Sequence, residues 1–294
     1  MNFLPYTWVL LAAVLWGTTG TAQSFIEGSA HPLTIGAFRL AIGGFSLLVF
    51  VLLTKKLKFS VIPWRPVLLS ALSMAIFQPL FFSSVQLTGI AIGTVAAIGS
   101  APVFAGLIEW AVLKKKPEKV WMAATLFAIL GCALLFADKG AADVNPAGVA
   151  MALGAGMSFA VYAIASKFVL AEIEAIPTVA IIFSLSAVCL LPFLFFFDLS
   201  YISLPQNITV IFYLGIAATS LSYILFSSGL KRISSSSAVT LSLAEPLTAS
   251  ILGVFVIGEI LSGISWIGVA LLLGGIVVLT FGKKKVSNQK ESLS

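Results

Sequence analysis

The sequence has 294 residues, of which 60% are hydrophobic and only 10% are charged, and its mean hydropathy is +1.10. A soluble domain holds roughly 25% charged residues, so this composition excludes an ordinary soluble protein and indicates a polytopic membrane protein. The net charge of +6 does not indicate nucleic-acid binding, because the basic residues lie in short connections between apolar runs, where such residues set membrane orientation.

Ten runs are long and apolar enough to cross a membrane, since a transmembrane helix needs about 20 such residues. They lie near residues 6–25, 33–53, 67–86, 90–112, 120–137, 147–169, 177–197, 208–230, 237–256 and 264–281. We therefore predict an all-α integral membrane protein with ten transmembrane helices. The first run lacks the basic residues that begin a signal peptide, so we expect it to be retained as the first span.

The basic residues predict how these spans are oriented. If the N-terminus is cytoplasmic, 15 of the 17 Lys and Arg residues fall in cytoplasmic loops or in the C-terminal tail. Only Lys139 falls in an outer loop, and Arg39 lies within the second span. The positive-inside rule predicts this asymmetry. We therefore expect a multi-pass protein of the plasma or inner membrane with both termini in the cytoplasm.

An internal repeat divides the chain into two halves. A shift of 144 residues places Pro102 on Pro246 and Gly131 on Gly275. We predict a first repeat at 1–140, a second repeat at 145–282 and a basic cytoplasmic tail at 283–294. Each repeat has five spans, an odd number, so the two repeats cross the membrane in opposite senses. Secondary transporters often share such inverted repeats, with the substrate site between them.

Four short motifs stand in and between these spans: Trp16-Gly17, Arg39, Glu245-Pro246 and Gly258-Glu259. Together with ten spans in two halves, this pattern resembles the EamA family of the drug/metabolite transporter superfamily. The resemblance implies a bundle in which four helices of each half line a central cavity, while helices five and ten lie at the periphery. It also implies transport of small metabolites, commonly amino acids and related compounds. The Gly-Glu turn has no counterpart in the first repeat, where lysines stand instead.

Glu245 is the strongest candidate for a functional group, because it lies about ten residues into the ninth span. A charge near the bilayer midplane costs at least about 2.5–3.5 kcal/mol, so such residues usually serve a site or a pathway. Its counterpart in the first repeat is Ala101, so the repeated fold does not require a carboxyl there. The alternative is a neutral, hydrogen-bonded acid that ties helices together.

Pro102 and Pro246 occupy equivalent positions of the two repeats. A proline inside a helix frees the carbonyl one turn earlier, so both prolines are hinge candidates, and Pro246 is also a candidate for the substrate pathway. A purely structural kink is the alternative at each position. Arg39 either pairs with Glu245, attracts an anionic group of the substrate, or extends outward to the membrane surface.

Polar and aromatic residues within the spans are further candidates to line a substrate pathway. They are Trp16, Thr18 and Thr21 in the first span, Gln78 in the third, Tyr162 in the sixth, and Ser222 and Tyr223 in the eighth. Thr18 and Thr21 are three residues apart and share a helix face. Hydrogen bonds between helices are the alternative role. For Glu109, near the cytoplasmic surface, an ion pair with the lysines at 114–116 is the favoured interpretation.

We expect no metal, disulfide or cofactor. Cys132 and Cys189 lie far apart in apolar segments, and His31 is the only histidine, so the spacings typical of metal and disulfide sites are absent. No GxxxxGK[ST] phosphate loop occurs, and ATP hydrolysis by this chain is not expected. An intramembrane enzyme needs a nucleophile with a base or a metal cluster, and neither is found. The protein is therefore not expected to be an enzyme.

The favoured interpretation is a secondary transporter of small organic metabolites, an exporter of amino acids or related compounds that works by alternating access. The alternatives are a flippase for lipids or lipid-linked intermediates and an uptake permease of the same fold. A channel usually needs symmetric rings of polar groups, which a single asymmetric chain lacks. The expected partners are a small-molecule substrate and the lipid bilayer, with protons as a candidate coupling ion and no nucleic acid. A monomer and a homodimer are both compatible with the sequence.

Overall fold

The structure is a computed structural model that describes residues 3–28, 30–55, 61–135, 137, 145–258 and 260–291, with 89–91 and 282–291 described in their backbone only. Every regular element within these ranges is helical. In chain order the elements are α1 (Leu4–Gln23), α2 (Pro32–Leu53), α3 (Trp64–Leu113), α4 (Lys119–Leu135), α5 (Pro146–Glu172), α6 (Ala175–Leu190), η2 (Leu191–Phe196), η3 (Ser200–Ser203), α7 (Pro205–Gly215), η4 (Ile216–Leu221), α8 (Ser222–Leu230), α9 (Ser235–Leu241), α10 (Ala244–Leu252), η5 (Gly253–Ile257) and α11 (Gly263–Glu291).

Eight helical stretches of the described residues are long and apolar enough to cross a membrane. The 20-residue α1 and the shorter apolar α4, with 17 residues, complete the set of ten predicted from the sequence. Large apolar side chains such as Leu126 and Phe127 lie exposed on the outside, where lipid is their natural environment. The prediction of an all-helical membrane bundle is confirmed. The predicted Gly258-Glu259 turn is only half visible, because Glu259 lies outside the described residues.

The long element α3 contains two spans, Trp64–Thr88 and Ile92–Leu113. A Cβ atom placed on Gly93 would lie 3.0 Å from the Cα atom of Val85. Eight residues of a straight α-helix rise about 12 Å, so the chain must reverse direction between Val85 and Gly93. α3 is therefore a helical hairpin, and its two halves are the third and fourth spans.

The eighth and ninth spans are each built from three helical pieces. The eighth span joins α7, the π-helix η4 and α8, and the ninth joins α9, α10 and the π-helix η5. A turn at Ser242 and Leu243 separates α9 from α10. π-Helical turns are rare and occur frequently at functional sites. Both spans thus depart from α-helical geometry inside the bundle.

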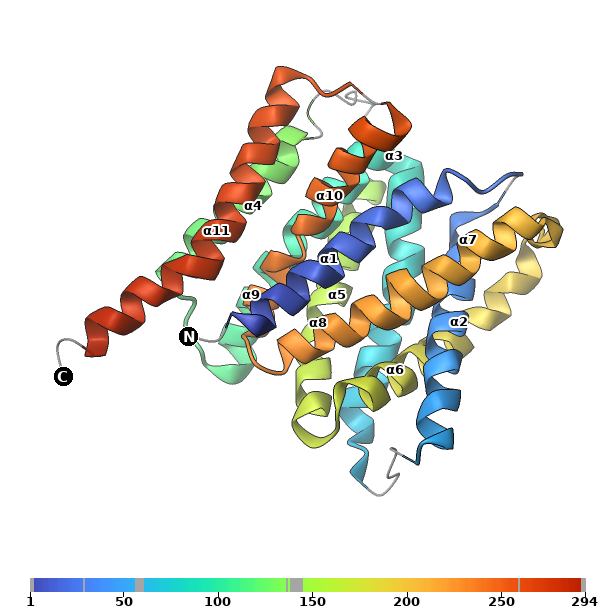
Figure 1. The fold of residues 1–294 in the computed structure, drawn as a ribbon, viewed down its shortest axis with the longest axis horizontal. Coiled ribbons are helices and arrows are strands. Elements are labelled where there is room, and N and C mark those ends of the chain that lie inside the picture. The colour runs from blue at the N-terminus through green and yellow to red at the C-terminus, as the bar shows by residue number, and fades with distance from the viewer. Residues whose placement is uncertain are drawn as a thin grey trace.

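α4 and α11 lie side by side at one edge of the molecule (Figure 1). A Cβ atom on Gly131 would lie 2.6 Å from the backbone nitrogen of Leu272, and one on Gly268 would lie 2.5 Å from the backbone nitrogen of Leu135. The two glycines therefore let the helices pack backbone against backbone. This pair is the fifth and tenth spans, so its place at the edge agrees with the periphery that the family resemblance implies.

The other helices surround the centre of the bundle, and helices of one half pack against helices of the other. α1 packs against α8 and α10, α2 packs against α6, and α3 packs against α5. The largest fully buried side chains, Tyr162, Phe183 and Phe226, form an aromatic core between α5, α6 and α8. The centre of the molecule is therefore an interface between the two halves of the chain.

Candidate functional site

A cavity of about 520 Å³ lies at this interface, where α1, α2, α3, α5, α8 and α10 meet. Its lining reaches from Trp16 and Tyr223, within their spans, to Ser24 and Ile257 at the ends of α1 and η5. The cavity therefore extends toward the end of the bundle at which α1 ends. Its volume lies in the range of small-molecule sites, about 300–1,000 Å³.

Most of the site residues predicted from the sequence meet in this cavity. The lining includes Trp16, Thr21, Arg39, Gln78, Tyr223, Glu245 and Pro246. These residues come from both halves of the chain. The bundle therefore gathers polar groups that are far apart in sequence around one space.

Thr18 and Ser222 lie outside the lining of the cavity. The hydroxyl of Thr18 is 2.7 Å from the hydroxyl of Tyr213, a contact between α1 and α7. The hydroxyl of Ser222 donates to the carbonyl of Ala218 at 2.7 Å. Both side chains therefore follow the alternative left open by the sequence, in which intramembrane hydroxyls bond to helices instead of facing a pathway.

Tyr162 and Pro102 also lie outside the lining. Tyr162 is fully buried, and its ring centroid is 5.8 Å from that of Tyr223, which does line the cavity. Pro102 is buried next to the lining residue Ala101, inside an unbroken helix. Tyr162 thus supports the cavity wall from behind, and Pro102 produces no interruption of α3.

Glu245 and Pro246 lie at a break in the ninth span. α9 ends at Leu241 and α10 begins at Ala244, so Glu245 is in the first turn of α10. Proline has no backbone N–H and its ring clashes with the carbonyl four residues earlier, which here belongs to Ser242. That carbonyl instead accepts a bond from the N–H of Glu245 at 2.9 Å. The break therefore presents the Glu245 side chain to the cavity from the start of a new helix.

A side-chain hydrogen bond also compensates for the backbone bond that is lost at this break. The N–H of Leu243 donates to Thr240 at 3.2 Å, which leaves the carbonyl of Val239 without its usual helical donor. The hydroxyl of Ser242 donates to that carbonyl at 2.7 Å. Buried backbone groups in a membrane need internal partners, and Ser242 supplies one.

Arg39 is positioned by the π-helix of the eighth span. Its Nε donates to the hydroxyl of Thr219 at 3.0 Å, and an Nη donates to the carbonyl of Ala218 at 3.4 Å. The Thr219 hydroxyl in turn donates to the carbonyl of Leu214 five residues earlier. Arg39 faces the cavity and does not extend outward to the membrane surface. The guanidinium keeps further N–H groups for a ligand, because it carries five donors.

The helix that carries Arg39 is fixed at its start by His31. The Nδ1 atom of His31 accepts a bond from the N–H of Leu33 at 3.3 Å, and its ring stacks on Phe197 with centroids 4.2 Å apart. Partial burial lowers the pKa of His31 below its usual value of 6.5. The imidazole is therefore neutral near pH 7, as an acceptor at a helix N-terminus must be.

Arg39 and Glu245 carry opposite charges into the same cavity without forming an ion pair. Both side chains line the space, yet no nitrogen of Arg39 lies within 4.0 Å of a carboxyl oxygen of Glu245. The described residues place no hydrogen-bond donor on the Glu245 carboxyl either. The cavity thus holds a guanidinium and, apart from it, a carboxyl group that can ionise, an arrangement that suits a ligand carrying both charges.

Two further polar groups of the lining have no partner. Trp16 Nε1 and Thr19 Oγ1 are buried, and neither makes a hydrogen bond. Buried polar groups are nearly always paired in native proteins, so an unpaired donor beside a cavity indicates a contact that a ligand makes. Thr19 belongs to the polar second half of the first span, but it is not among the pathway candidates predicted from the sequence.

The apolar part of the lining is largely aromatic. Phe77, Phe81 and Phe82 from α3 and Phe159 from α5 line the cavity together with Trp16. These phenylalanines are not among the residues predicted from the sequence to line a pathway. A phenylalanine in a span carries no signal that separates a cavity wall from a lipid-facing surface, since both favour apolar side chains.

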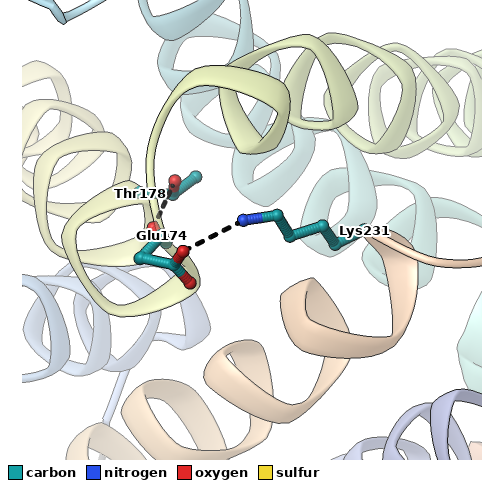
Figure 2. Close-up of polar contacts among 3 residues, drawn as sticks. All are labelled: Glu174, Thr178 and Lys231. Carbon is teal, nitrogen blue, oxygen red and sulfur yellow. Dashed lines mark hydrogen bonds and ion pairs between the residues drawn. The ribbon is translucent and has the colours of Figure 1, made fainter.

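The opposite end of the bundle is closed by direct packing. A Cβ atom on Gly229 would lie 2.5 Å from the carbonyl oxygen of Pro5, so α8 and α1 touch there. Trp121 Nε1 donates to the hydroxyl of Thr240 at 3.0 Å. Figure 2 shows Lys231, at the end of α8, paired with Glu174. The Nζ and Oε1 atoms are 3.3 Å apart, and a surface contact of this kind contributes at most about 1 kcal/mol.

Glu109 lies at this closed end and corrects one interpretation of the sequence. It is 4% exposed, and its Oε2 accepts a bond from the N–H of Ser236 at 3.2 Å. No described lysine lies within ion-pair distance of it. Glu109 therefore joins α3 to the start of α9 instead of forming a rim ion pair, because the folded hairpin α3 brings it beside α9.

Among the described residues, no group of three or more His, Cys, Asp or Glu side chains is placed to hold a metal ion. The charged groups of the cavity are those already described, one guanidinium and one carboxyl.

Comparison with known proteins identifies the family. The model of the EamA-like transporter family matches this chain twice, at residues 3–137 and 146–281. The "Uncharacterized transporter YwfM" of Bacillus subtilis is 50% identical over 94% of this chain and 94% of its own length. The "Threonine/homoserine exporter RhtA" of Escherichia coli K12 is 27% identical over 98% of this chain and 95% of its own.

A solved crystal structure shares the fold, with a TM-score of 0.84 and 22% identity over 97% of this chain and 99% of its own. The family model covers nearly the whole chain. This protein belongs to the EamA-like transporter family.

Proposed function

We propose that this protein is a secondary transporter that exports small zwitterionic metabolites, amino acids or related compounds, by alternating access through the central cavity. The observation that carries the proposal is the pair of opposite charges, Arg39 and Glu245, which face one cavity without contacting each other. A zwitterion fits between them, with its carboxylate on the guanidinium and its ammonium on the carboxylate. The name of the Escherichia coli relative RhtA, a threonine/homoserine exporter, supports the amino-acid class.

The charge distribution supports an orientation for this cycle. With both termini in the cytoplasm, as the positive-inside rule favours, the end at which α1 terminates is external, and the cavity opens outward. The closed end, where Gly229 packs against Pro5, then separates the cavity from the cytoplasm. When the transporter turns inward, the two repeats, 1–140 and 145–282, exchange roles, so that the outer end closes and the cytoplasmic end opens. The basic tail at 283–294 remains cytoplasmic.

Glu245 also provides a route for coupling to protons. The carboxylate holds the ammonium group of a bound substrate and takes up a proton when the substrate leaves. Return of the empty carrier then moves that proton inward. Each step involves a carboxyl that already faces the cavity at the break between α9 and α10.

The test is transport in proteoliposomes that contain purified protein and no nucleotide. We expect an imposed proton gradient to drive amino-acid movement in the wild type. Glu245→Gln should reduce the rate about 10- to 100-fold, because it removes a hydrogen bond to a charged group that contributes about 1.5–3 kcal/mol. It should also abolish the dependence of transport on pH. Glu174→Gln is the matched control, because the Glu174 side chain lies on the surface, outside the cavity lining, and forms an ion pair with Lys231.

Three results would contradict the proposal. The first is a Glu245→Gln variant with unchanged rate and pH profile. The second is transport that strictly requires ATP. The third is labelled lipid, and no amino acid, as the transported species, which would favour a flippase. A separate experiment tests the orientation. If impermeant thiol reagents reached a cysteine placed at the C-terminus from outside, the orientation would be the reverse of the one proposed.

A further inference from the structure

We infer that the substrate carries a bulky aromatic side chain beside its two charges, and that Phe77, Phe81 and Phe159 select for it. This inference rests on the proposed function and narrows its substrate class. It starts from an aromatic wall, defined here as Phe82, Phe81, Phe77, Phe159 and Trp16, all of which line the cavity.

The five rings of the aromatic wall form a continuous series. The ring centroids of Phe82 and Phe81 are 5.5 Å apart, as are those of Phe81 and Phe77. Phe77 and Phe159 follow at 5.9 Å, and Phe159 and Trp16 at 6.1 Å. All these separations lie within the range of favourable aromatic contacts. A planar ring placed against this wall therefore finds both faces and edges of other rings to contact.

The aromatic wall and the charged groups belong to different elements. Arg39 stands on α2 and Glu245 on α10, whereas the phenylalanines stand on α3 and α5. Trp16 on α1 belongs to both regions. Its ring contacts Phe159 in the aromatic wall, and its unpaired Nε1 can donate to the polar head of a ligand. A ligand with a zwitterionic head and a flat apolar tail matches this division of the cavity.

A small hydroxylated side chain matches it less well. Phenylalanine rings offer no donor or acceptor to a hydroxyl, which would lose its water when placed against them. Phe77 and Phe81 are partly accessible to the cavity in this structure. A small side chain would leave both rings uncovered, whereas an aromatic side chain would cover them. The wall therefore favours a ring over a short polar chain.

The experiment measures exchange of radiolabelled L-phenylalanine by the full chain in proteoliposomes, with unlabelled compounds as competitors. L-Threonine tests the side chain, phenethylamine lacks the carboxylate, and 3-phenylpropionate lacks the ammonium group. We expect each of the three to compete about tenfold more weakly than L-phenylalanine, a discrimination that lost apolar or polar contacts give in a binding pocket.

Variants test which side chains are responsible. Phe81→Ala should lower exchange of L-phenylalanine about tenfold and exchange of L-threonine less, because only the aromatic tail contacts the wall. Phe77→Leu retains most of the apolar volume and should weaken L-phenylalanine less, which guards against a failure to fold. The matched control is Phe127→Ala, since Phe127 is exposed on the outside of α4 and should alter neither substrate.

The outcomes separate this inference from the proposed function. If L-threonine and L-phenylalanine exchange equally well and Phe81→Ala affects both alike, the aromatic selection is wrong while zwitterion transport stands. If phenethylamine or 3-phenylpropionate competes as well as L-phenylalanine, the zwitterion and with it the proposed function are wrong. If the wild type exchanges no amino acid at all, both proposals are overturned together.

Discussion

The fourth and ninth spans occupy equivalent places in the two halves of the chain but have different backbones. A shift of 144 residues places Pro102 on Pro246, yet the helix continues through Pro102 and is interrupted just before Pro246. A proline alone therefore does not decide whether a transmembrane helix breaks. Its neighbours decide.

The neighbours differ in their hydrogen-bonding groups. Four residues before each proline stand Ile98 in the fourth span and Ser242 in the ninth. The hydroxyl of Ser242 bonds to the carbonyl of Val239 that the break exposes, whereas Ile98 has no group to do so. The broken span then carries a carboxyl, Glu245, where the unbroken span carries Ala101. The asymmetry places one acidic group, and not two, in the cavity.

The two spans nevertheless pack in a similar way. The fourth span touches α5 at Gly156, where a Cβ atom would lie 2.5 Å from the carbonyl oxygen of Ala97. The ninth span touches α1 at Gly17, where a Cβ atom would lie 2.7 Å from the carbonyl oxygen of Glu245. Each span thus lies against the first helix of the opposite half at a glycine of that helix, although the two glycines do not stand at equivalent positions.

The largest effect should come from exchanging the two prolines, one at a time, for alanine. Pro102 lies inside an unbroken helix, where a proline costs about 3 kcal/mol, so Pro102→Ala should raise the free energy of unfolding by up to about that amount. Pro246 lies in the first turn of α10, where a missing N–H has no helical partner to lose. Pro246→Ala should therefore change stability little but reduce transport, because the ninth span regains the option of a continuous helix.

Thermal unfolding of the two variants in detergent, followed by circular dichroism, measures the stability, and exchange in proteoliposomes measures the transport. Equal effects of the two substitutions on both quantities would mean that transport does not depend on the break before Pro246.

The difference between these spans also marks how far sequence alone predicts this molecule. The ten spans were predictable because a helix that crosses lipid must be apolar for its whole length. Arg39 and Glu245 were predictable as candidates for a cavity because a charge in such a run is costly and therefore conspicuous, although the sequence left open whether Arg39 extends outward instead. The break itself was predictable only in part: Pro246 indicated an irregularity, but Pro102 gave the same signal without one.

Other features of the cavity left no distinctive pattern in the sequence. Phe81 lines the cavity and Phe127 faces outward, although both are apolar residues in apolar helices. Thr18 and Thr21 share one helix face, yet only Thr21 lines the cavity, because Tyr213 of α7 takes the hydroxyl of Thr18. These assignments depend on which helix lies opposite, and that is a property of the tertiary packing.

A smaller effect should follow from a methyl group added between α1 and the ninth span. Gly17→Ala would place its Cβ 2.5 Å from the Cβ of Thr248 and 2.7 Å from a backbone oxygen, and overpacking of this kind typically costs about 1–3 kcal/mol. The control is Gly20→Ala, one turn further along α1, where a Cβ meets nothing within 4 Å. Thermal unfolding of both variants should show a loss for Gly17→Ala alone, and a similar loss for both would refute the close contact.

The smallest effect should come from Ser242→Ala, which removes the hydroxyl that distinguishes the broken span from the unbroken one. The carbonyl of Val239 would then lose its 2.7 Å donor, and an unsatisfied buried acceptor costs about 1–3 kcal/mol. The lower value is expected here, because Ser242 lines a cavity that water can enter.

Ser228→Ala is the matched control. The hydroxyl of Ser228 also bonds to a carbonyl, that of Ile224 at 2.7 Å, but it does so within the regular helix α8, where the backbone itself serves that carbonyl. We therefore expect thermal unfolding to show a loss of stability of about 1 kcal/mol for Ser242→Ala and almost none for Ser228→Ala. Equal values for the two variants would mean that the hydroxyl of Ser242 does not compensate the break, and that the proline and Glu245 set the geometry of the ninth span without it.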